Sequence, residues 1–279
     1  MKQLFDQTGF ECSKVVTKKY STSFSLAVNM LSPKIREDIY SIYAFVRVAD
    51  EIVDSFHGYD KNKLINKFEE DYYNALETGI SLNPILNSFQ LTVKKCNITD
   101  DLVQAFLTSM KLDLNKTEYE TQAEYNNYIY GSADVVGLMC LKVFVNGDNE
   151  KYESLKSYAM RLGSAFQKVN FLRDLKADHD DLNRTYFPNT DLSNLDEASK
   201  QHIINDIEKD FAEGLEGIKR LPMDAKFGVF MAYRYYSQLL KKLKKTPALD
   251  IKNSRIRVPN YKKVELLTRS YVKFQLNLL

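Results

Sequence analysis

The sequence predicts an all-α protein, for three reasons. Its 279 residues include only 10 glycines and 6 prolines, too few for the many tight turns of a β-sandwich or a repeated βαβ fold. Apolar residues recur at helical spacing along most of the chain. Capping residues precede several of these periodic stretches. We therefore expect roughly eight to ten helices, in a single domain over residues 1–279.

Start and stop signals define the helices of the first half. Ser32-Pro33 is a capping hydroxyl followed by proline at the first helical position, which predicts a helix from Pro33 to about Phe56. The other helices of this half are predicted over 61–77, from Pro84 onward, after Thr99-Asp100, and from a Thr121–Glu124 capping box to about Val145.

The second half is interrupted by two less regular stretches. Helical periodicity predicts helices over 150–178, 196–220, 223–245 and 261–279. Leu221-Pro222 and Pro247 end two of them, because proline cannot continue a helix. A polar loop is expected over 180–195 and an irregular stretch over 248–260.

Charge and cysteine content narrow the class of protein. Lys plus Arg is 39 and Asp plus Glu is 37, whereas a nucleic-acid binder needs a strongly basic surface, so we expect no nucleic-acid partner. Cys12, Cys96 and Cys140 lack CxxC spacing, which predicts free thiols in a reducing compartment. No N-terminal signal is recognisable, and no apolar run approaches the ~20 residues that span a bilayer. We expect a cytoplasmic protein.

A first polar stripe lies on the predicted helix 33–56. Tyr43, Arg47, Asp50 and Asp54 are spaced four, three and four residues apart, which stacks them on one helix face. The rest of this helix is largely apolar, and charges near a buried surface need partners. The alternative is a solvated face with an Arg47–Asp50 ion pair.

A matching stripe lies on the predicted helix 150–178. Gln167, Asn170, Asp174 and Asp178 follow at spacings of three, four and four, while apolar residues occupy the other faces. Each stripe carries two carboxylates one turn apart. Two such stripes on two long helices indicate the facing walls of one cavity.

Carboxylate and amide oxygens are hard ligands that suit Mg²⁺, with Mn²⁺ as the other candidate. Mg²⁺ keeps water and phosphate oxygens in its shell, so these stripes could bind a diphosphate through the metal. Arg47 and Arg173 lie beside the stripes and could contact phosphate oxygens. Departure of a diphosphate leaves a carbocation, which a dry aromatic pocket stabilises; the 18 Tyr and 16 Phe residues could supply one.

These residues and several further blocks resemble the phytoene/squalene synthase family. The aspartate motifs are Asp50-Glu-Ile-Val-Asp54 and the stretch from Asn170 to Asp178, preceded by Gln167. The further blocks are Tyr20-Ser-Thr-Ser-Phe-Ser-Leu-Ala27, residues 128–137, Arg184-Thr-Tyr-Phe-Pro188, Tyr236-Ser-Gln-Leu-Leu240 and Arg255-Ile-Arg-Val-Pro259. They occur in family order over about residues 12–263. Residues 131–140 look closest to bacterial phytoene synthases.

The resemblance implies the isoprenoid synthase fold, with long helices around a central active-site cavity. It implies a prenyl transferase that condenses two isoprenyl diphosphates head to head through a cyclopropyl intermediate. The leading hypothesis is the Mg²⁺-dependent conversion of two geranylgeranyl diphosphates to phytoene via prephytoene diphosphate, in carotenoid biosynthesis. One alternative is a squalene or dehydrosqualene synthase that uses two farnesyl diphosphates. The other is a helical interaction or assembly protein derived from the family.

The resemblance also implies residue roles. Five residues would hold the metal–diphosphate cluster: Asp50, Asp54, Asn170, Asp174 and Asp178. Eight would contact diphosphates or orient the ligands: Ser21, Arg47, Gln167, Arg173, Arg184, Tyr186, Tyr236 and Arg255. Phe24, Tyr43 and Tyr128 would line the cavity and bind substrate. We expect the four aspartates, Arg47, Tyr43 and Tyr236 to act in catalysis.

Three further features bear on cofactor and partners. No GxGxxG follows a strand-like segment, so no nicotinamide cofactor is expected for phytoene formation. Asp134 stands where many relatives have a small residue, and would alter the pocket if it faced the cavity. The basic run Lys241–Lys245 fits either a solvated helix end or peripheral contact with anionic lipids. No feature of the sequence specifies an oligomeric state.

Overall fold

The computed structural model describes residues 1–180, 184, 186–188, 195–253 and 256–275, without the side chains of 176–180, 252, 253, 260, 264, 272, 273 and 275. Within them the secondary structure is helical and no β-strand occurs. The helices are α1 (Lys2–Tyr20), α2 (Thr22–Asn29), α3 (Pro33–Asp54), α4 (Lys61–Thr78), α5 (Pro84–Cys96), α6 (Asp100–Leu112), α7 (Gln122–Ile129), the π-helical segment η1 (Tyr130–Asp134), α8 (Val135–Phe144), α9 (Asn149–Asp180), α10 (Glu197–Arg220), α11 (Met223–Lys245), α12 (Ala248–Asn253) and α13 (Asn260–Gln275).

The all-α prediction is confirmed, but the described helices outnumber the eight to ten expected. Helices α1 and α2 occupy the first 32 residues, where none is predicted. The buried residues of α1 are Gly9, Ser13 and Thr17, so its inner face carries no hydrophobic signal. The helix predicted up to Val145 is divided by η1, and α12 forms in the stretch expected to be irregular.

Local capping explains several helix ends. The Thr121–Glu124 capping box forms as predicted, and α4 ends at Gly79, whose positive φ favours glycine. Pro33 opens α3 as predicted, but the Ser32 side chain makes no capping hydrogen bond, so that part of the prediction is wrong. The cysteines Cys12, Cys96 and Cys140 are free, as expected.

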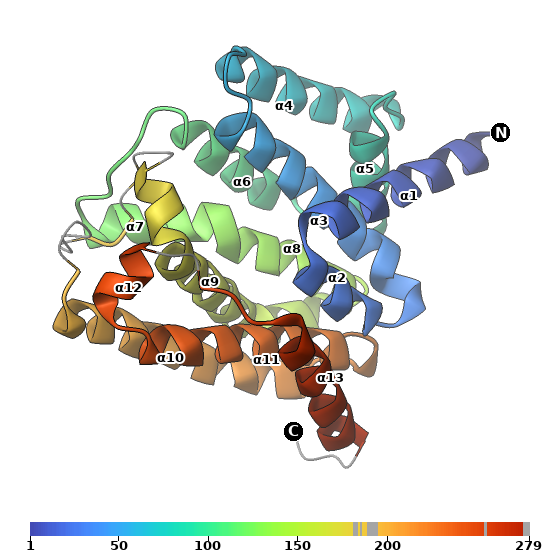
Figure 1. The fold of residues 1–279 in the computed structure, drawn as a ribbon. Helices are drawn as coiled ribbons and strands as arrows, with labels where there is room; N and C mark the ends of the chain where they lie inside the picture. Colours follow the sequence, from blue (N-terminus) through green and yellow to red (C-terminus); the bar gives the residue numbers. More distant parts are fainter. Residues whose placement is uncertain (181–183, 185, 189–194, 254–255, 276–279) are drawn as a thin grey trace.

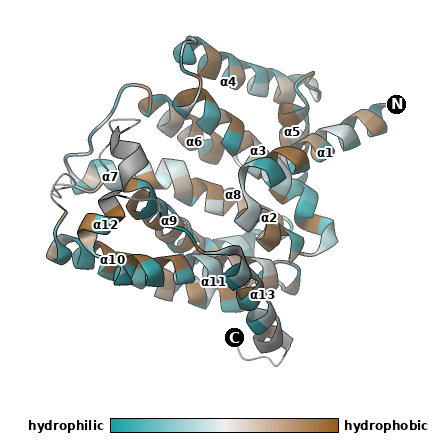
Figure 2. Cartoon of the chain, viewed as in Figure 1, coloured by the Kyte–Doolittle hydropathy of each residue, from teal (hydrophilic) through white to brown (hydrophobic). Residues whose placement is uncertain are grey.

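The long helix α9 runs through the middle of the molecule beside α8, with α3 to α6 on one side and α10 and α11 on the other (Figure 1). Outer helices such as α10 carry both polar and apolar residues (Figure 2). The buried residues of α10 recur every three or four positions, as Ile203, Ile207 and Phe211 do. No helix in this described portion is long and apolar enough to cross a membrane.

Candidate active site

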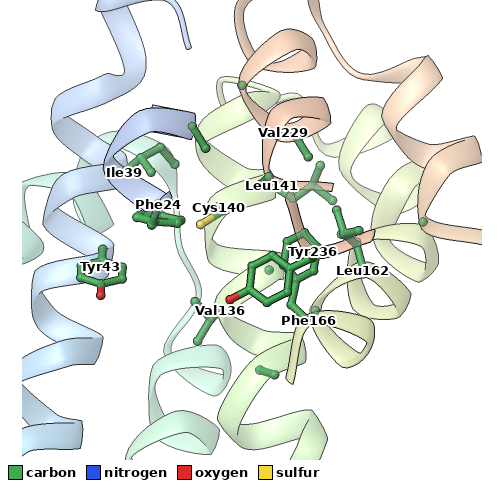
Figure 3. A pocket seen from close by; sticks show the side chains of 18 of the residues that line it. Phe24, Ile39, Tyr43, Val136, Cys140, Leu141, Leu162, Phe166, Val229 and Tyr236 are labelled. Atoms are coloured by element: carbon green, nitrogen blue, oxygen red, sulfur yellow. The ribbon is translucent and has the colours of Figure 1, made fainter. Parts of the chain in front are cut away.

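An apolar cavity of about 370 Å³ lies between α2, α3, α8, α9, α10 and α11. Tyr43 of α3 and Tyr236 of α11 face it from opposite walls, and Cys140 of α8 lies between them (Figure 3). On α9 the lining residues extend from Leu155 to Arg173. The cavity therefore follows α9 over a stretch of about 27 Å at ~1.5 Å per residue.

Close helix packing shapes this cavity. Five of the ten glycines line it: Gly137, Gly163, Gly214, Gly217 and Gly228. A Cβ atom on Gly163 would stand 2.9 Å from the carbonyl oxygen of Ala133, so glycine lets α9 approach η1. A Cβ on Gly217 would stand 2.3 Å from the Cβ of Tyr158, so glycine lets α10 approach α9 there.

The first stripe lies on α3 and reaches the cavity. Arg47 forms ion pairs with both Asp50 and Glu51, and its guanidinium lies 4.6 Å from the centre of the Tyr20 ring. The Arg47–Asp50 pair of the alternative interpretation does form, with side chains 30% and 34% exposed. Burial and the charge of Asp54 raise the pKa of Asp50 to about 6, so the two carboxylates repel each other and a cation between them would relieve the repulsion.

The second stripe lies on α9. The Arg173 Nε atom donates to Asp174 Oδ1 at 2.9 Å, and both side chains are mostly buried. The Tyr236 hydroxyl donates to Asn170 Oδ1 at 3.3 Å, so α11 supports this stripe. Gln167 and Arg173 line the cavity. The Asp178 backbone continues α9, and its side chain lies outside the described residues.

Arg184 contacts the first stripe. It lies on the segment after α9, and its Nη1 atom donates to Asp54 Oδ1 at 2.8 Å. Its side chain is only 5% exposed. Tyr43 of the first stripe and Gln167 of the second line the same cavity.

The N-terminal block forms the wall on the α2 side. Ser21 caps α2, where its Oγ accepts from the Phe24 backbone N–H at 3.2 Å. The Phe24 ring stacks on Tyr43 with centroids 4.7 Å apart. Phe24 and Tyr43 both line the cavity. Across the cavity, the Phe166 ring stacks on Tyr236 with centroids 4.2 Å apart, so both walls carry aromatic pairs.

Tyr128, which the resemblance places in the cavity lining, is not among the residues that line this cavity. Its ring is buried in an aromatic stack with Tyr119, Tyr186 and Phe171, and its hydroxyl donates to Asp113 at 2.9 Å. Tyr128 is absent from the cavity lining because α7 turns it toward the end of α6. Tyr186 belongs to the same stack, 3.9 Å from the Phe171 ring. Arg255 lies outside the described residues.

Asp134 faces away from the cavity, toward α9. It accepts a hydrogen bond from the Ser164 hydroxyl at 2.7 Å and is 6% exposed. Burial raises the pKa of Asp134 to about 7, and the charge of Asp210 adds to this increase. The hydrogen bond from Ser164 and the charges of Lys168 and Arg161 lower the pKa and so oppose it. Asp134 therefore fixes η1 to α9 without changing the cavity lining.

The raised pKa of Asp134 predicts a pH-dependent stability that Asp134→Asn removes. The folded protein holds a proton that the unfolded chain releases near pH 4, so this group's contribution falls as pH rises from about 4 to about 7. Asn keeps an acceptor for Ser164 but does not titrate. The free energy of unfolding of the variant relative to wild type should rise by about 2 kcal/mol between pH 5 and pH 7.5. Urea unfolding at both pH values measures it, and a pH-independent difference would contradict the assignment.

Two residues near the stripes were missed by sequence reasoning. Glu51 pairs with Arg47, and the i, i+4 spacing of the two was a usable signal. Asp113 lies beyond the end of α6, where its backbone and side chain both approach Arg184. Asp113 has no signal in the neighbouring sequence, because its partners Tyr128 and Arg184 are 15 and 71 positions away.

The donor set fits Mg²⁺. Asp50 and Asp54 present hard oxygen ligands one turn apart, and their mutual repulsion favours a bound cation. Among the described side chains, no three acidic, histidine or cysteine groups converge closely enough to enclose a metal by themselves.

Comparison with known proteins identifies the family. The chain belongs to the squalene/phytoene synthase family, whose model matches residues 17–262. This family consists of prenyltransferases. The chain is 27% identical to a phytoene synthase of Arthrospira platensis over 92% of its own length and 91% of that protein. It is 25% identical to a 15-cis-phytoene synthase of Synechocystis over 96% of its length and 86% of that protein.

Solved structures confirm the isoprenoid synthase fold. A dehydrosqualene synthase superposes with a TM-score of 0.82 at 22% identity, covering 97% of this chain and 98% of that one. The squalene synthase HpnC from Alicyclobacillus acidocaldarius superposes with a TM-score of 0.75 at 22% identity, covering 86% of this chain and 94% of that one. At these identities the likeness concerns the fold alone.

Proposed function

We propose that this enzyme condenses two geranylgeranyl diphosphates head to head to phytoene via prephytoene diphosphate, with Mg²⁺, in carotenoid biosynthesis. Membership of a prenyltransferase family supports an enzyme rather than an interaction or assembly protein. The relatives named phytoene synthase support the product. The farnesyl alternative, which would give squalene or dehydrosqualene, differs in the length of substrate that the cavity must hold.

The choice of substrate rests on the relatives named phytoene synthase, and the length of the cavity is compatible with it. Its lining follows α9 for about 27 Å at ~1.5 Å per residue, from Arg173 beside the aspartates to Leu155. A chain of four isoprene units is longer than one of three by about 5 Å, with C–C bonds of about 1.5 Å. The cavity is long enough for the longer chain in extended form.

Metal and diphosphate binding are assigned to the aspartate end of the cavity, and stabilisation of the carbocation to its interior. Asp50, Asp54 and Asp174 would hold Mg²⁺, which supplies charge stabilisation to the departing diphosphate. Arg47 and Arg173 are already beside these carboxylates and would bind diphosphate oxygens. The interior is lined mainly by apolar and aromatic side chains. Its stacked rings, the Phe24–Tyr43 pair and the Phe166–Tyr236 pair, present π faces to a developing carbocation.

Steady-state release of diphosphate with each substrate tests this proposal. The purified enzyme with Mg²⁺ should show a kcat/KM for geranylgeranyl diphosphate at least about tenfold above that for farnesyl diphosphate. A preference for farnesyl diphosphate would favour the alternative, and no release from either substrate would contradict the enzyme assignment. Chelation of the metal should abolish release in all cases.

Peripheral membrane contact through Lys241–Lys245 stays a prediction. The Lys242 ammonium donates to the Arg257 carbonyl oxygen at 2.8 Å and Lys244 pairs with Glu208 at 2.7 Å, which supports the helix-end interpretation. If the run binds anionic lipid, replacing Lys241, Lys242, Lys244 and Lys245 by glutamine should release the protein from anionic vesicles in sedimentation. Each basic residue contributes about 1 kcal/mol. Sedimentation unaffected by the substitutions would reject lipid contact.

A further inference from the structure

The buried carboxylate of Asp113 lies close to the part of the site formed by Asp50, Asp54 and Arg184, which we call the diphosphate cleft. Tyr128 of α7 donates its hydroxyl to Asp113 Oδ2 at 2.9 Å. The Tyr128 ring is itself fixed between Tyr119, with centroids 4.6 Å apart, and Tyr186, with centroids 5.5 Å apart. The other oxygen of Asp113, Oδ1, is buried without a hydrogen-bond partner among the described residues. Burial makes ionisation of this fixed carboxylate costly, and the charge of the nearby Arg184 offsets part of that cost.

Asp113 approaches Arg184 through both backbone and side chain. Arg184 Nη2 donates to the Asp113 carbonyl oxygen at 2.8 Å, and Arg184 Nη1 lies 4.0 Å from Asp113 Oδ2. The same Nη1 atom donates to Asp54 Oδ1 at 2.8 Å on the cleft side. The guanidinium therefore lies between two carboxylates, one structural and one in the first aspartate motif.

This arrangement matters when Asp54 engages a cation. Asp54 then shares its negative charge with the metal, and Arg184, whose side chain is 5% exposed, would be left as a buried cation with weakened compensation. The charge of Asp113 compensates Arg184 from behind. Arg184 can thus stay at the cleft with Nη1 directed toward Asp54, where a diphosphate oxygen can accept from it.

We propose that Asp113 is a positioning residue that holds Arg184 at the diphosphate cleft, with Tyr128 fixing Asp113 in turn. The inference rests on the proposed function, because it takes the cleft to bind a metal–diphosphate. Burial raises the pKa of Asp113 to about 7, while the Arg184 charge and the Tyr128 hydrogen bond favour its ionised form. Arg184, which contacts both carboxylates, links Asp113 to Asp54 of the first motif.

Calorimetric binding of inorganic pyrophosphate with Mg²⁺ tests this role without turnover. Asp113→Asn retains the shape and an acceptor for Tyr128 but removes the charge, and we expect it to weaken binding at least tenfold. Asp134→Asn is the matched control. It is a carboxylate of similar burial that faces α9 instead of the cleft, and its affinity should equal that of wild type.

A double-mutant cycle separates positioning from a purely structural role. If Asp113 acts through Arg184, adding Asp113→Asn to Arg184→Gln should change the affinity less than twofold. Multiplicative effects of the two substitutions, or wild-type affinity in Asp113→Asn, would overturn the proposal.

If Asp113→Asn does not fold, Tyr128→Phe is the alternative variant, because it removes only the hydroxyl that fixes Asp113. Binding should then weaken severalfold, and unchanged affinity would overturn the proposal. Absence of pyrophosphate binding by wild type would instead refute the cleft itself, and the inference with it.

Discussion

Alanine at Asp50 or at Asp174 is expected to lower kcat by about 10³-fold or more while the protein remains folded. Each substitution removes a carboxylate that would link Mg²⁺ to the diphosphate, and the side chains that pair with these two carboxylates cannot act as anionic ligands in their place. The neighbours Arg47 and Arg173 are cations. Turnover is measured by diphosphate release, and folding by circular dichroism and thermal unfolding.

The two variants should differ in stability. Burial and the Asp54 charge already raise the pKa of Asp50 to about 6, so the ionised side chain does not stabilise the fold and its loss should leave the melting temperature unchanged or higher. Asp174 pairs with the mostly buried Arg173, and its loss should lower the melting temperature by a few degrees.

Asp60→Ala is the control for both substitutions. Asp60 is an exposed carboxylate that caps α4 by accepting from the Lys63 backbone N–H at 2.9 Å. Its loss should reduce stability by about 1 kcal/mol and leave turnover unchanged. Near-normal activity in Asp50→Ala or Asp174→Ala would refute the metal assignment.

The second large effect is expected at Tyr158, in the part of the cavity remote from the aspartates. Tyr158 lines the cavity, its ring lies 5.0 Å from the Arg220 guanidinium, and Gly217 packs against its Cβ. Tyr158→Ala should extend the cavity and raise the ratio of kcat/KM for geranylgeranyl over farnesyl diphosphate by about tenfold or more. A single methylene in an apolar pocket already changes such ratios by about 10-fold to 200-fold.

Tyr152→Ala provides a matched control on the same helix. Its ring also lies against a cation, 3.9 Å from the Lys142 ammonium, but Tyr152 does not line the cavity. The control should destabilise the protein without changing the substrate ratio. Equal ratios for wild type and Tyr158→Ala would show that this part of the cavity does not hold the substrate chain.

The parts of the site with a local signal could be predicted from the sequence. The stripe residues on α3 and α9 are spaced by helical turns, so their common faces follow from periodicity. Most helix boundaries likewise follow from caps and breakers. Helix α1 could not be predicted in this way, since its buried face consists of Gly9, Ser13 and Thr17 and lacks apolar periodicity.

Features that depend on distant contacts could not be predicted. Asp113 gains its role only when the fold brings Tyr128 and Arg184 to it. The direction of Tyr128 depends on how α7 packs against the end of α6. The orientation of Asp134 away from the cavity likewise depends on Ser164 of α9. In each case the residue type was visible in the sequence, and its partner was 15 or more positions away.

The identity of the hydrocarbon product tests the central claim most directly. Purified enzyme is incubated with Mg²⁺ and either geranylgeranyl or farnesyl diphosphate, with and without a reduced nicotinamide, and the extracted hydrocarbons are identified by mass spectrometry. We predict phytoene from geranylgeranyl diphosphate, formed without reductant and abolished by chelation of the metal. Squalene or dehydrosqualene from farnesyl diphosphate with no phytoene, or no hydrocarbon from either substrate, would contradict it.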